Sequence, residues 1–141
     1  MAKMDLHTTN YTNTFIEVAE DCPAMQGEVP PLNDKSKSVA RLQYEILSNH
    51  PYQFTSDDVL FQIYAKRNDL SKSELKAAKM QFFSKGQPCF RCSPLTKRYG
   101  WGIHADKEGR IAMYGLGSEE YKKLSLDKSL EKVKAMRSKR V

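Results

Sequence analysis

Hydrophobic and polar positions alternate in two parts of the chain, and this pattern predicts β-strands. In the run 12–19 every second residue from Thr14 is apolar or β-branched, as in a half-buried strand. The runs 99–105 and 110–115 are also rich in β-formers, and a short polar turn with a glycine joins them. The sequence therefore predicts one strand near the N-terminus and a β-hairpin at about 99–115.

The middle of the chain has the apolar spacing of α-helices. The first predicted helix spans 36–49 and must end before Pro51, because the residue before a proline is disfavoured in the α-region. Thr55 resembles a helix cap with an aspartate three residues later, and it begins a second, short helix. A clearer capping box starts at Ser71 and begins a third helix, which ends at Gly86.

The C-terminal region predicts one more helix. Ser118 can cap it, and two glutamates follow near its positive end, while Leu126, Leu130 and Val133 continue a thin apolar stripe. With a further short strand expected near Phe90, strands stand apart from a run of helices. This order predicts a single α+β domain with a small antiparallel sheet that contains the hairpin and is packed by three or four helices.

The two ends of the predicted domain differ from its middle in their composition. Residues 1–11 are polar and without periodicity, so we expect a loose leader. The basic segment 122–141 is expected to be a helix or a tail. It carries eight basic and two acidic residues, which equals the whole net charge of +6. Such a segment can bind nucleic acid, although folding back onto its own domain is the simpler use.

Length and composition limit the class of protein. A chain of 141 residues with 40% hydrophobic residues is the size of one ordinary domain. We expect neither a membrane span nor export, because the sequence has no run of ~18 apolar residues and no signal peptide pattern. Three cysteines is an odd number, which fits a reducing compartment. The sequence predicts a cytoplasmic protein and leaves its oligomeric state open.

The segment 86–104 concentrates the residues best suited to a site. It holds the only tryptophan, two of the three cysteines and a basic turn between prolines and glycines. Three cations and two hydroxyls in this turn can bind a phosphate or carboxylate: Arg91, Ser93, Thr96, Lys97 and Arg98. A solvated basic turn is an equally good reading, and the glycine-rich phosphate loop is absent.

Two ring side chains after this turn can add to a site. Trp101, with Tyr99 and Tyr114, can form a stacking platform, although packing in a buried hairpin face is favoured. His104 can bind a ligand or act as a general acid or base near neutral pH. It shares a strand face with Gly102, and a structural histidine is the commoner case.

Cys89 and Cys92 form a C-x-x-C motif, a spacing that can bind zinc or form a redox disulfide. The surroundings do not favour either use. A helix has just ended, Pro94 follows, and no second close pair of ligands completes a zinc set. We therefore expect two half-buried thiols, no metal and no cofactor.

Three stretches together resemble a known family: Gln87–His104, which includes the motif SPLTKRYGWGIH, with Phe15–Pro23 and Asp57–Phe61. Across nearly the whole chain the sequence is similar to a family of small bacterial proteins classed as a domain of unknown function. The resemblance implies no activity. In that family's pattern the position of Cys92 is usually a small residue without a thiol, which weakens the metal interpretation. Cys22 and Cys89 fit the pattern, which leaves a joint role for them open.

These observations give three functional hypotheses. The leading one is a cytosolic protein that binds a small anionic or phosphate-bearing ligand through the 91–104 loop and strand. The second is an enzyme in which His104 is the acid or base and Cys89 a nucleophile. The third is nucleic-acid binding through the basic C-terminal segment, with affinity that falls steeply with salt.

Overall fold

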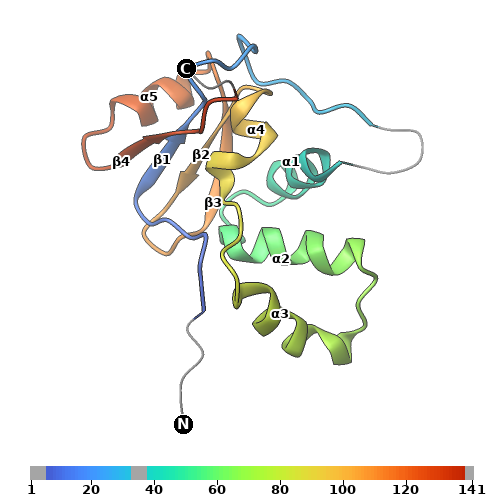
Figure 1. The fold of residues 1–141 in the computed structure, drawn as a ribbon. Helices are drawn as coiled ribbons and strands as arrows, with labels where there is room; N and C mark the ends of the chain where they lie inside the picture. The colour runs from blue at the N-terminus through green and yellow to red at the C-terminus, as the bar shows by residue number, and fades with distance from the viewer. Residues whose placement is uncertain (1–5, 33–37, 139–141) are drawn as a thin grey trace.

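One four-stranded sheet organises the computed structural model, which describes residues 6–32 and 38–138 (Figure 1). The elements, in chain order, are β1 (Thr14–Glu17), α1 (Val39–Asn49), α2 (Ser56–Arg67), α3 (Leu75–Phe83), α4 (Pro94–Lys97), β2 (Trp101–Ala105), β3 (Ile111–Gly115), α5 (Glu119–Leu126) and β4 (Glu131–Lys134). The sheet has the order β3-β2-β1-β4, with α5 on one face and α1 and α4 on the other (Figure 1). This arrangement confirms the predicted α+β fold.

The predicted hairpin and N-terminal strand are present. β2 and β3 pair antiparallel from Trp101↔Gly115 to Ala105↔Ile111, and β1 pairs antiparallel with β2. The turn of the hairpin places Gly109 at φ +81°, a conformation that a residue without a Cβ adopts readily. The local pattern was therefore sufficient to locate these three strands.

The C-terminal segment departs from the expected helix. α5 ends at Leu126, and the turn after it is closed by Asp127, whose carboxylate accepts from the backbone N–H of Ser129 at 2.8 Å. Such a local bond competes with helix continuation. Residues 131–134 then form β4, parallel to β1, with Val133 opposite Ile16. The sheet is thus mixed rather than wholly antiparallel, because pairing with β1 overrides the helical spacing.

The two faces of the sheet are packed differently. Ile16 and Ile103 lie opposite each other in the main core, on the face toward α1, α2 and α4. On the other face Phe15 packs edge-on against Tyr121 of α5, with ring centroids 4.9 Å apart. A Cβ on Gly102 would lie 2.6 Å from the Phe15 ring and 2.7 Å from the Tyr121 ring. Glycine at this position therefore allows the aromatic layer under α5.

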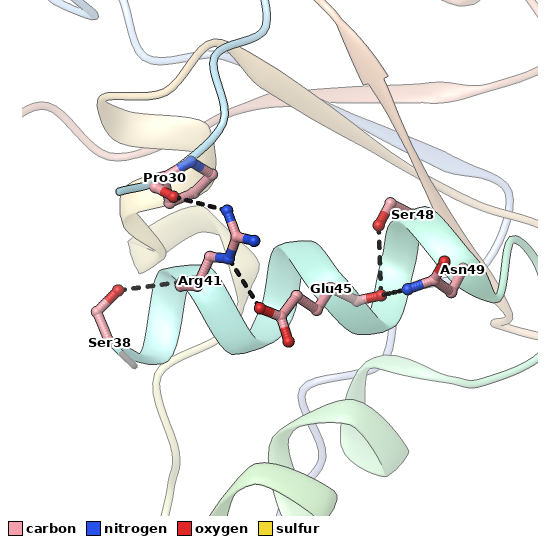
Figure 2. A network of polar contacts seen from close by, with 6 residues as sticks. All are labelled: Pro30, Ser38, Arg41, Glu45, Ser48 and Asn49. Carbon is pink, nitrogen blue, oxygen red and sulfur yellow. Dashed lines mark hydrogen bonds and ion pairs between the residues drawn. The ribbon is translucent and has the colours of Figure 1, made fainter. Parts of the chain in front are cut away.

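The predicted helix caps at Thr55 and Ser71 are present, and Ser38 is a further cap that was not predicted. Thr55 and Asp58 form the predicted capping box of α2, and a second one precedes the 3-10 turn Lys72–Glu74 that leads into α3. Ser38 caps α1 by accepting from the N–H of Arg41. The Arg41 guanidinium donates to Glu45 at 2.8 Å and to the carbonyl of Pro30 at 3.1 Å (Figure 2). These bonds tie the preceding loop to α1.

The described part of the leader is held against the domain rather than loose. Thr8 and Thr9 both bind the carboxylate of Asp57 at the start of α2, at 2.6–2.7 Å. The N–H of His7 donates to the carbonyl of Phe83 at 2.8 Å. Residues 6–11 therefore form part of the fold, whereas residues 1–5 of the expected leader lie outside the described residues.

Candidate functional site

The segment expected to carry the site is more structured than a loop. The strand predicted near Phe90 is absent: Phe90–Cys92 is a single 3-10 turn, followed directly by α4. Ser93 caps α4, and Pro94 occupies its first turn, where the missing N–H has no cost. The prolines and the serine thus specify a short helix that leads into β2.

The two hydroxyls expected to contact a ligand are used inside this segment. Thr96 is fully buried, and its hydroxyl donates to the carbonyl of Phe90 at 2.6 Å. Ser93 is 5% exposed; its hydroxyl accepts from the N–H of Leu95 and donates to Oε1 of Gln43 at 2.5 Å. The Thr96 hydroxyl therefore stabilises the 3-10 turn. The Ser93 hydroxyl instead holds the side chain of Gln43.

The three predicted cations do different things. The Nε of Arg91 donates to the carbonyl of Lys134 at 2.8 Å, which joins the segment to β4. Lys97 is half-buried at the end of α4, and Arg98 is exposed. In the described ranges 6–32 and 38–138, the ion pairs involve neither Lys97 nor Arg98. These two side chains remain available to an anion at the surface.

Trp101 and His104 face opposite sides of the sheet. The indole Nε1 of Trp101 donates to the carbonyl of Glu28 at 2.7 Å, and its ring lies against Gly27, where a Cβ would come within 2.8 Å. Its ring centroid is 5.8 Å from that of Tyr44. Trp101 is therefore a packing residue that fixes the long loop, in agreement with the favoured core interpretation.

His104 belongs to a hydrogen-bonded group that the sequence did not reveal. The hydroxyl of Tyr52 lies 2.7 Å from Nδ1 of His104 and 2.8 Å from the hydroxyl of Tyr114. Tyr52 stands in the turn between α1 and α2 at φ +59°, and its N–H donates to the carbonyl of Ile111 at 2.9 Å. The predicted face shared by His104 and Gly102 is confirmed by the register of β2 and β3.

Burial sets the protonation of this group. Desolvation lowers the pKa of His104 below its ordinary value of 6.5, although Asp106 and Asp127 act in the opposite direction. Burial also raises the pKa of Tyr52, and its hydrogen bond to Tyr114 adds to this effect. At neutral pH a neutral imidazole of His104 therefore faces the neutral phenol of Tyr52. Such a histidine can accept a proton from a bound partner.

The three cysteines do not meet as one group. All are free thiols, and Cys22 lies near Tyr121 on the α5 side. Cys89 and Cys92 line a cavity on the helix side of the molecule, where Cys89 lies 3.8 Å from the hydroxyl of Tyr11. His104 instead contacts Tyr52, whose hydroxyl also lies next to that of Tyr114. The structure therefore assembles neither a Cys22–Cys89 pair nor a contact between Cys89 and His104.

That cavity is a candidate for a ligand site. It has a volume of about 370 Å³ and lies between α1, α2, α3 and residues 87–94. This volume is in the range of small-molecule sites. Its walls are mainly apolar, contributed by Val39, Leu60, Ile63, Tyr64, Phe82 and Pro88. Residues 87–94, the first part of the segment singled out from the sequence, thus form one side of a ligand-sized space.

Gln43 places a fixed hydrogen-bond donor in this cavity. Ser93 Oγ accepts from the N–H of Leu95 and donates to Oε1 of Gln43, so the amide oxygen of Gln43 faces the serine. The Gln43 nitrogen then carries two N–H groups that have no hydrogen-bond partner within the described residues. The side chain lines the cavity although the residue is only 3% exposed. Among the described residues no buried side-chain nitrogen or oxygen lacks a hydrogen-bond partner, so the Gln43 nitrogen is accessible, and a ligand or a water can accept from it.

The remaining polar groups of the cavity include one cation. Arg67, exposed at the end of α2, lines the cavity, as do Asn68 and Gln87. The amide nitrogens of Asn68 and Gln87 donate to the backbone carbonyls of Tyr64 and Phe82, at 2.8 and 2.7 Å. Gln43 and Arg67 are therefore two of the side-chain donors that this cavity offers to an anion, beside the Tyr64 hydroxyl and the second N–H of the Asn68 and Gln87 amides.

Sequence reasoning missed both of these residues. Gln43 follows Val39 by four positions, so it falls in the apolar stripe of α1, and a polar residue in such a stripe is a usable signal. Arg67 gave no signal, because a cation in the last turn of a helix is ordinary. Tyr52 gave no sequence signal either. The turn that contains it contacts β3 only after the chain has folded.

The basic C-terminal segment is partly engaged within the chain. Lys134 and Arg137 form ion pairs with Glu20 at 3.4 and 3.7 Å, and Lys132 donates to backbone carbonyls of Asp127 and Leu130. Lys122, Lys123 and Lys128 are exposed. Some of the basic side chains of this segment therefore hold β4 in place. Fewer of them are available to bind a nucleic acid.

Fold and cavity together define a small α+β domain with a ligand-sized space between its helices and the 87–94 segment. The chain belongs to a family of unknown function, DUF6157, whose model matches residues 6–141. No curated protein and no solved structure matches it. Across the part of the chain that the structure describes, no helix is long and apolar enough to cross a membrane.

Proposed function

We propose that this chain is a cytoplasmic protein that binds a small anionic ligand in the cavity between α1, α2, α3 and residues 87–94. The observation that carries the proposal is the Gln43 side chain, which lines the cavity, accepts from Ser93 through its oxygen and has no partner for its nitrogen within the described residues. Three free cysteines fit the proposed reducing compartment.

The cavity also suggests the chemistry of the ligand. Its apolar walls favour a hydrocarbon body, while Gln43 and Arg67 supply donors for a carboxylate or phosphate group. The ligand class that fits is therefore an amphiphilic anion. A surface site at Lys97 and Arg98 is the alternative, and it lacks both an enclosing wall and a fixed neutral donor.

Nuclear magnetic resonance titration with octanoate and octyl phosphate tests this proposal, with octylamine as the cationic control. We expect the amides of residues 39–43 and 87–94 to shift with either anion. Arg67→Ala should weaken binding about tenfold, an effect of 1.4 kcal/mol, and Lys66→Ala, a neighbouring cation that does not line the cavity, should not. Loss of binding in Lys97→Ala/Arg98→Ala instead, with Arg67→Ala unchanged, would move the site to the surface.

A second candidate function is proton transfer by His104. The observation that favours it is the 2.7 Å contact between Tyr52 and Nδ1 of His104, which orients the ring, while Nε2 has no hydrogen-bond partner in the described chain. A screen of ester, phosphoester and carbonyl substrates tests it. Activity that disappears in His104→Ala and persists in His7→Ala supports the enzyme hypothesis. Equal activity in both variants refutes it.

A further inference from the structure

Two sulfur atoms meet where the 3-10 turn Phe90–Cys92 lies against the C-terminal segment. The Sγ of Cys92 lies 3.2 Å from the Sδ of Met136. Two bonds hold the two segments together, because the N–H of Met136 donates to the carbonyl of Arg91 at 2.8 Å and Arg91 Nε donates to Lys134. The methionine is therefore fixed beside the cysteine by the backbone, although the two are far apart in sequence.

The third sulfur belongs to Cys89, which begins the same turn. The N–H of Cys92 donates to the carbonyl of Cys89 at 2.9 Å. Side chains three residues apart in a 3-10 turn lie above one another. Consistent with this geometry, both cysteines line the same cavity, and both are half-buried free thiols. The turn thus presents two thiols to the same side, with a thioether next to the second.

We propose that Cys89, Cys92 and Met136 form a binding site for copper(I). Thiolate and thioether sulfurs are soft ligands that select Cu(I), an ion that is stable with two or three sulfur ligands. Zinc fits less well, because structural zinc takes four ligands and its common sets lack thioethers. Within the described residues no group of three or more His, Cys, Asp or Glu side chains is placed to bind a metal.

The charge balance of binding also fits the surroundings. Each cysteine releases its proton, so one Cu(I) and two thiols give a complex of net charge −1 and two protons in solution. The Arg91 guanidinium lies close by, since it interacts with Tyr11, whose hydroxyl is 3.8 Å from Cys89 Sγ. This site does not depend on the proposed anionic ligand. The sequence argument against a metal applies to zinc with four ligands. It does not apply to a site that includes the thioether of Met136.

An anaerobic titration of the full chain with Cu(I), in competition with bicinchoninate, tests the site. We expect one Cu(I) per chain. Cys89→Ser and Cys92→Ser should each lower the affinity by about 100-fold, and Met136→Leu by about tenfold, as expected for lost ligands. Cys22→Ser is the matched control and should leave the affinity unchanged, because this thiol lies near Tyr121.

Two results would overturn the proposal. One is an equal loss of affinity in Cys22→Ser and Cys92→Ser, which would indicate non-specific binding to thiols. The other is an X-ray absorption spectrum of the loaded chain that shows mainly nitrogen or oxygen neighbours instead of sulfur. Thermal unfolding of each variant without copper shows whether it remains folded, and Met136→Leu keeps the test valid if a cysteine variant unfolds.

Discussion

The hydroxyl of Tyr52 lies 2.7 Å from Nδ1 of His104, so a residue from the α1–α2 turn holds the ring of a residue in the sheet. This contact forms in the folded chain, where burial lowers the pKa of His104 below 6.5. Unfolding returns the imidazole to water and to its ordinary pKa. The unfolded chain therefore binds more protons than the folded chain at mildly acidic pH.

The first prediction concerns stability against pH. Because the folded pKa is depressed, the contribution of His104 is fully present above pH 6.5 and is lost as the pH falls toward its folded pKa. Urea unfolding at pH 7.5 and 5.0 measures this effect. The free energy of unfolding should fall more in the natural chain than in His104→Gln. Equal losses in both chains would contradict the shift.

The second prediction concerns Gly102 in β2. Gly102→Ala places a methyl within 2.7 Å of the rings of Phe15 and Tyr121, so α5 must move away from the sheet. We expect a loss of about 1–3 kcal/mol in the free energy of unfolding, as for overpacked cores. Gly86→Ala is the control, because its nearest atom would be 3.9 Å away. Chemical denaturation of both variants makes the comparison, and similar midpoints would refute the packing argument.

The third prediction concerns Ser93, which caps α4 and orients Gln43. Ser93→Ala removes the cap and leaves the Gln43 oxygen without its donor, which together should cost about 2–4 kcal/mol. Octanoate affinity should fall as well, because the Gln43 amide is no longer fixed. Ser48→Ala, an exposed serine of α1, should change neither property. Unchanged octanoate binding in a folded Ser93→Ala chain would disprove the orienting role.

The fourth prediction concerns the N-terminal segment. Asp57→Ala removes the acceptor of Thr8 and Thr9, and we expect a loss of about 1–2 kcal/mol. Hydrogen exchange at the Thr9 amide should become faster than in the natural chain. Glu108→Ala, an exposed acidic residue of the hairpin turn, serves as control. Slow exchange at Thr9 in Asp57→Ala would show that other contacts hold the segment.

Local signals in the sequence are enough to predict the positions of the hairpin, of β1 and of the capped helices. The capping pair of Thr55 and Asp58, for example, depends on residues three positions apart. β4 could not be found in this way, because its strand pairing with β1 joins the two ends of the chain. Its own residues carry a helical spacing, and tertiary pairing overrides such a weak preference.

The candidate site was predicted only in part, for a similar reason. The segment around Cys89 and Ser93 was recognised from its composition, and it does line a cavity. Sequence does not show whether a hydroxyl points outward or inward, so Thr96 was expected in a site although it is fully buried. Gln43 and Arg67 belong to helices whose meeting with this segment is decided only by tertiary packing.

The parallel pairing of β4 with β1 also bears on how the chain is made. β1, near the start of the chain, is an inner strand whose two neighbours are β2 and β4. A growing polypeptide can form α1, α2 and α3 early, since their contacts are local, but β1 must wait for both partners. Completion of the sheet therefore waits until β4 has been synthesised, and until then the edge of β1 is open to pairing with other chains.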